Sequence, residues 1–165
     1  MKRERWIDAP AEIDLGAVVH GPLVLAAGSG VAVGLRCVFA HQTGLHLPLV
    51  VLATGVHAEA AGRQTGQPAA PPGYRPSDPP GWSHLQVSGE VNGRVGEMEP
   101  FSASRSSSLD RYTEQAEYWI GELPGDGVLR LTVGWPRIGL DPATTTLQLG
   151  PPDQIATGAI TLLRP

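Results

Sequence analysis

Histidine and cysteine are the side chains in this sequence best suited to metal binding or catalysis near neutral pH. His41 and His46 flank a short glycine-containing turn, so the two rings could face each other across it. A zinc site needs further ligands. His57 or His84 could supply one, but their spacing does not require it. We therefore expect histidines exposed at turns, and we assign no metal ligand and no cofactor.

Potential nucleophiles lack the surroundings that would activate them. Cys37, the only cysteine, falls on the apolar side of a predicted strand, where a free cysteine packs as a small hydrophobic residue. Residues 102–108 are rich in serine but contain no Gly-x-Ser-x-Gly elbow, so we expect an exposed polar connection there. Asp126 and Asp141 could lie in loops, but no closely spaced carboxylates indicate a calcium site. No catalytic residue is assigned.

Aromatic side chains are the better candidates for a binding surface. Tyr118 and Trp119 are adjacent in a predicted strand, so one should enter the core while the other reaches the surface, where it could anchor a partner. Tyr74 and Trp82 lie in a proline-rich segment. These four residues are the predicted binding residues. The alternative for Trp119 and Trp135 is burial in the core.

The elements that would position these residues are short strands. Alternating apolar residues over 31–39, a Gly-containing turn and a second apolar run over 45–52 predict a β-hairpin. Further strands are expected over residues 18–26, interrupted by Gly21-Pro22, and over 84–91, 115–120, 128–135 and 144–149. In the strand over 128–135, the odd-numbered residues form the apolar face. Residues 155–163 fit either a last strand or a short C-terminal helix.

These elements predict an all-β fold, an antiparallel β-sandwich of about 7–8 strands. Six prolines and few aliphatic residues between positions 60 and 82 indicate a long loop there. Neither side of this loop is large enough for a core of its own. We therefore expect one β-sandwich domain over residues 1–165.

Composition excludes several classes of partner. The net charge is −4 and the basic residues are dispersed, which argues against nucleic-acid binding. No apolar stretch approaches the roughly 20 residues that cross a membrane, and no signal peptide is recognised. A lone cysteine forms no internal disulfide. We expect a cytoplasmic protein without a membrane partner.

One set of short motifs looks familiar. It comprises Glu117-Tyr118-Trp119-Ile120, Leu123-Pro124, Gly127-Val128-Leu129, Trp135-Pro136-Arg137-Ile138-Gly139-Leu140 and the Thr43-Gly44 hairpin. Together they resemble a family of small uncharacterised β-rich proteins from GC-rich bacteria, over most of the chain outside the proline-rich segment. That family has no assigned activity, so the resemblance implies a shared fold and no catalytic residue.

Three functions fit these observations, in decreasing order of preference. The first is a non-catalytic protein-interaction or assembly module, in which sheet edges of two chains pair. The second is a small-ligand or glycan-binding sandwich that uses Tyr74, Trp82 or Trp119. The third is an enzyme of unrecognised type, which requires that at least two of the histidines reach a common point.

Overall fold

A computed structural model of the 165-residue chain describes residues 4–6, 10, 14–65 and 84–162. Its elements, in chain order, are β1 (Glu4–Arg5), β2 (Asp14–Leu15), β3 (Ala17–His20), β4 (Leu23–Ala27), β5 (Val31–Leu35), β6 (Val38–His41), β7 (Gly44–Thr54), α1 (Gly55–Thr65), β8 (Gln86–Val91), β9 (Arg94–Met98), β10 (Ser102–Ser107), β11 (Arg111–Ile120), β12 (Val128–Trp135), η1 (Pro136–Ile138), β13 (Leu140–Gln148) and β14 (Ile160–Thr161).

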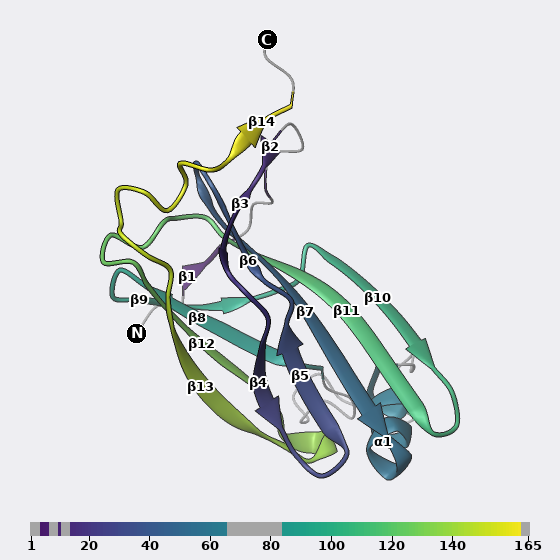
Figure 1. Ribbon diagram of the computed structural model, residues 1–165. Helices are drawn as coiled ribbons and strands as arrows, with labels where there is room; N and C mark the ends of the chain where they lie inside the picture. The colour runs from purple at the N-terminus through teal and green to yellow at the C-terminus, as the bar shows by residue number, and fades with distance from the viewer. Residues whose placement is uncertain (1–3, 7–9, 11–13, 66–83, 163–165) are drawn as a thin grey trace.

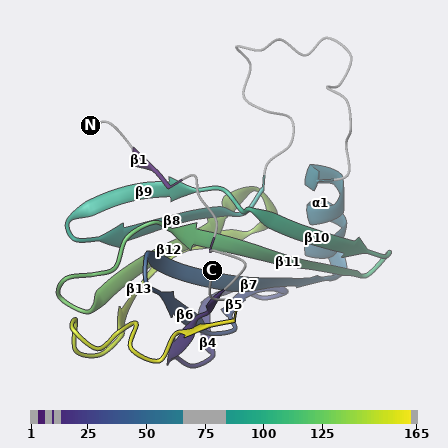
Figure 2. The same ribbon diagram turned by 90° about the horizontal axis from the view of Figure 1, so that it is seen from above.

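Two β-sheets form the layers of the fold (Figures 1 and 2). The first has the strand order β1-β9-β8-β12-β13, in which only β1 joins in parallel. The second has the order β10-β11-β7-β5-β4. β6 pairs with the first residues of β7, and β3 pairs with the other side of β6. β2 and β14 pair as a small separate ribbon. The predicted all-β sandwich is confirmed.

Strand periodicity explains the core between the sheets. The odd-numbered residues of β12, from Leu129 to Trp135, are all buried, as the alternation predicts. They belong to the same core cluster as the buried odd-numbered residues of β7, Leu45 to Ala53. The predicted hairpin is also confirmed, because β7 pairs with both β5 and β6.

Two interruptions divide what would otherwise be longer strands. Gly21-Pro22 separates β3 from β4, as expected from a proline that cannot donate to the ladder. Arg36 and Cys37 separate β5 from β6. The period-two pattern slips at this break, and Cys37 is only half-buried. The prediction that Cys37 lies in the core is therefore wrong. Burial still raises the pKa of its thiol, opposed by the positive charge of Arg36.

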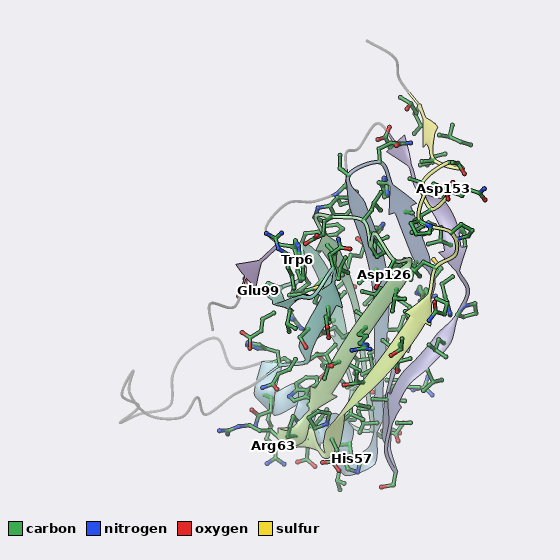
Figure 3. All side chains as sticks on the ribbon, turned by 90° about the vertical axis from the view of Figure 1, so that its left-hand side faces the viewer. Trp6, His57, Arg63, Glu99, Asp126 and Asp153 are labelled. Carbon is green, nitrogen blue, oxygen red and sulfur yellow. The ribbon has the colours of Figure 1, made fainter. Side chains whose placement is uncertain are left out.

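Helix α1 occupies residues that were expected to belong to a loop. The predicted loop over 60–82 starts too early, because residues up to Thr65 are helical and the prolines begin only at Pro68. The remainder of that loop lies outside the described residues. Ala58 and Ala61 of α1 are buried against the sandwich. His57 donates from Nδ1 to the carbonyl oxygen of Ile138 at 2.6 Å, which ties α1 to η1 at one end of the molecule (Figure 3).

Two further segments differ from expectation or resolve an open alternative. The serine-rich stretch expected to be a connection forms β10, an edge strand whose side chains are all exposed. An edge strand exposed on both faces has no hydrophobic alternation, which is why the pattern did not reveal it. Near the C-terminus, a series of turns leads into the two-residue strand β14. Among the described helices, none is both long and apolar enough to traverse a bilayer.

Candidate functional site

The predicted binding residues on β11 are both buried. Tyr118 points into the core at 1% exposure, and Trp119 on the opposite face is 4% exposed. The expectation that one of them reaches the surface is wrong, because His41 packs against Trp119 with 5.6 Å between the ring centroids and Gly44 lies directly beside its indole. Tyr74 and Trp82 lie outside the described residues.

The side chains over Trp119 form a cluster of histidines and aromatic rings on the outer face of the second sheet. The ring centroids of His41 and His46 are 6.3 Å apart. Phe39 and Phe101 approach His46 to 5.4 Å and 5.5 Å, respectively. Two of the five histidines therefore come together, as the turn between β6 and β7 suggested. They are largely enclosed rather than exposed.

Burial determines the electrostatics of this cluster. It lowers the pKa of His41, helped by the charge of His46 and opposed by that of Asp14. It also lowers the pKa of His46, although Glu117 opposes this shift by accepting a hydrogen bond from His46 Nε2 at 3.1 Å. Nδ1 of His41 is buried without a hydrogen-bond partner among the described residues. Burial thus favours the neutral form of both imidazoles.

A neutral histidine oriented by a carboxylate can exchange a proton, but this cluster does not resemble a metal centre. No group of three or more His, Cys, Asp or Glu side chains in the described part of the chain could hold a metal ion. His57, on α1, is hydrogen-bonded to Ile138 of η1 and lies away from this cluster. His84 instead lines a surface hollow on the first sheet, together with Glu97 and Thr132.

The second feature of the same sheet is its free edge at β10 (Figure 1). β10 pairs with β11 over six residues in unbroken register, from Ser102 opposite Glu117 to Ser107 opposite Tyr112. Its other side meets no strand among the residues described. The strand contains neither proline nor lysine, and no bulge interrupts it.

The other sheet edges carry features that discourage pairing between molecules. Register shifts interrupt β3 and β4 where each pairs with its neighbour. β13 contains Pro142, and the register of its pairing with β12 shifts near Trp135. β1 is only two residues long. Among the described edges, β10 alone is both regular and of ordinary length.

An ion pair between exposed Arg105 and buried Glu114 fixes β10 to the sheet. Glu114 is 2% exposed, and its Oε1 accepts hydrogen bonds from Arg105 Nε at 2.6 Å and from the Tyr112 hydroxyl at 2.7 Å. Burial raises the pKa of Tyr112, and the bond to Glu114 adds to this effect. The one charge on β10 is therefore neutralised from within its own sheet. Sequence reasoning missed Glu114, which precedes the strand expected over 115–120, since an isolated glutamate gives no sign of burial.

Comparison of the chain with protein-family models, curated proteins and solved structures gave no match. The resemblance to a family of small β-rich bacterial proteins therefore stays a prediction.

Proposed function

We propose that this protein is an assembly module that self-associates by pairing the β10 edges of two copies. The observation that carries the proposal is the contrast between β10 and the other described edges: β10 is regular and six residues long, whereas the others are short, bulged or proline-containing. An unprotected edge offers a row of backbone donors and acceptors to a second chain.

Hydrogen-bond parity identifies the groups that would face the second copy. The Ser108 N–H donates to the Arg111 carbonyl at 2.8 Å, so alternate residues of β10, beginning with Ser106, direct their backbone groups toward β11. The backbone groups of Ala103, Arg105 and Ser107 consequently point away from the sheet. Two such edges related by a twofold axis would form an antiparallel ladder and join the two sheets into one.

Charge does not oppose this pairing. Arg105 is the only charged residue of β10, and its guanidinium bonds to Glu114 of its own chain. The other five side chains are serines and one alanine, which are small enough to let a second backbone approach.

Light scattering after size exclusion tests the proposal directly. The wild-type protein should have a mass near twice 17.4 kDa and dissociate on dilution. Ala103→Pro removes an outward N–H and leaves the bonds to β11 intact, so this variant should be monomeric. Ala103→Lys should also be monomeric, because a charged residue on an edge opposes pairing. Ala103→Ser, which keeps the N–H and the small side chain, is the matched control and should remain a dimer.

Circular dichroism of each variant establishes that the sandwich is retained. A wild-type protein that is monomeric at all accessible concentrations would contradict the proposal. So would a dimer that survives both Ala103→Pro and Ala103→Lys.

The cytoplasmic location and the absence of nucleic-acid partners remain part of this proposal. They are supported by the lone cysteine and the net charge of −4.

An enzymatic function is our second candidate, supported by the 6.3 Å separation of His41 and His46. His46, oriented by Glu117, would act as a general base. A panel of ester and phosphoester substrates should then reveal a hydrolysis that His46→Gln abolishes and Gln115→Ala retains. No difference between these variants across the panel would exclude this role for those substrates.

A further inference from the structure

A glycine opens a hollow in the outer face of the second sheet. Gly34 of β5 lies between Val24 of β4 and Val50 of β7 in the registered pairing of the three strands. The missing side chain contributes to an apolar depression of about 350 Å³, which Pro22 also lines. Val24 is 64% exposed, so apolar surface faces solvent here.

Neither the backbone nor the packing of the chain requires glycine at position 34. Gly34 is not among the residues with positive φ. A Cβ added to it would meet the Leu23 carbonyl oxygen at 3.8 Å, which is ordinary contact. Glycine in a strand interior destabilises it relative to alanine, and it often marks a site where a ligand approaches the backbone closely.

The cationic residue Arg36 also lines this depression. Arg36 is exposed, and its backbone N–H donates to the Pro48 carbonyl at 2.9 Å. Arg36 also lines a second hollow of about 260 Å³, together with Ser102, Ser104 and Gln115. No carboxylate pairs with Arg36 in the described part of the chain, whereas Arg63, Arg94, Arg105 and Arg130 each have one.

One carboxylate does line the second hollow, and its position limits the pose of a ligand. Glu117 lies across β7 from Arg36 and is hydrogen-bonded to His46. An anion must therefore contact Arg36 from the side of the apolar depression, away from Glu117.

We propose that this face binds a small amphipathic carboxylate. Its apolar tail lies along the depression between Val24 and Val50, over Gly34. Its carboxylate pairs with the fork of donors on Arg36. Ser104 and Gln115 can bond to polar substituents next to the head group. The proposal does not depend on self-association through β10, and light scattering tests that separately.

Titration calorimetry with decanoate, below its micellar concentration, tests the ligand class. Decanol and acetate are the matched probes, since decanol retains the apolar tail and acetate retains the carboxylate. Decanoate should bind, and each of the other two should bind at least roughly tenfold more weakly. Amide chemical shifts should move in β4, β5 and β7 and leave β12 unchanged.

Three substitutions separate the two halves of the site. Gly34→Val fills the depression and should abolish decanoate binding, whereas the smaller Gly34→Ala should weaken it and keeps a test available if valine disturbs folding. Arg36→Gln should reduce the affinity for decanoate to that for decanol. Arg111→Gln changes an exposed arginine on β11 of the same sheet. This variant is the control and should bind decanoate as the wild type does.

The proposal is overturned if decanoate does not bind, or if decanoate and decanol bind equally well. It is also overturned if binding survives both Gly34 substitutions, or if the shifted amides scatter over both sheets. The last result would indicate detergent-like adsorption.

Discussion

The buried carboxylate of Glu114 should stabilise the fold chiefly as an acceptor for the Tyr112 hydroxyl. Both Tyr112 and Arg105 donate to the same oxygen, Oε1. Glu114→Ala deprives the buried hydroxyl of its carboxylate acceptor, at a cost of about 1–3 kcal/mol. It also removes one buried methylene group, at about 0.8 kcal/mol. Arg105 is 42% exposed, so water replaces most of what it loses. The total loss in free energy of unfolding is about 2–4 kcal/mol.

Glu114→Gln distinguishes the acceptor from the charge. The amide oxygen can accept both hydrogen bonds in place of Oε1, so only the charge assistance disappears. We expect this substitution to lower the free energy of unfolding by about 1 kcal/mol. Gln115→Ala, on the opposite and exposed face of the same strand, is the control and should change it by less than about 0.5 kcal/mol.

Urea unfolding followed by circular dichroism gives these free energies, provided that the dependence on urea concentration is the same for all variants. Equal losses for the alanine and glutamine variants would refute the argument, because they would assign the stabilisation to charge. A loss of less than about 1 kcal/mol for alanine would show that the buried bond to Tyr112 contributes little.

Two further predictions concern the histidine cluster and its neighbourhood. The free energy of unfolding should fall as the pH drops below 6.5, because His41 and His46 both take up a proton more readily in the unfolded chain, and each contributes at most about 1.4 kcal/mol per pH unit. Urea titrations at several pH values should show a smaller slope for His41→Leu. Gly44→Ala should lower the melting temperature measurably, at a cost of about 1–3 kcal/mol, because its Cβ would overlap the Ile120 carbonyl and the indole of Trp119. Gly34→Ala, with room for its Cβ, should not lower the melting temperature, since glycine in a strand interior is less stable than alanine. Equal melting temperatures for the two alanine variants would contradict the packing argument.

The fold class could be predicted because its signal is local and repeated. Alternation in β12 and β7 reports directly which side chains face the core, and glycine-containing turns divide the strands. The same rule failed at Cys37, because Arg36 and Cys37 belong to neither β5 nor β6 and break the period. A period-two alternation of apolar residues cannot reveal such a break, because the break depends on how β7 pairs separately with β5 and with β6.

The prediction that Tyr118 or Trp119 reaches the surface failed for a different reason. Alternation correctly places Trp119 on the face opposite Tyr118, but a face turned away from the core is not always open to water. β6 and β7 bring His41 and Gly44 over the indole, and Gly16 lies close against the ring of His41. This covering depends on contacts between residues far apart in sequence, which strand periodicity does not contain.

The two proposals rest on residues with little side chain, and a search for reactive groups passes over such residues. The serines of β10 leave the edge open to pairing, because they add no charge to it and the strand contains no bulge. Gly34 opens the depression beside Arg36 because it has no side chain to fill the space between its neighbours. Both features acquire meaning only through strand order: a serine run matters once it forms the last strand of a sheet, and a glycine matters once valines flank it on both sides. Strand order arises from non-local pairing, so such sites are accessible from the structure and not from residue types alone.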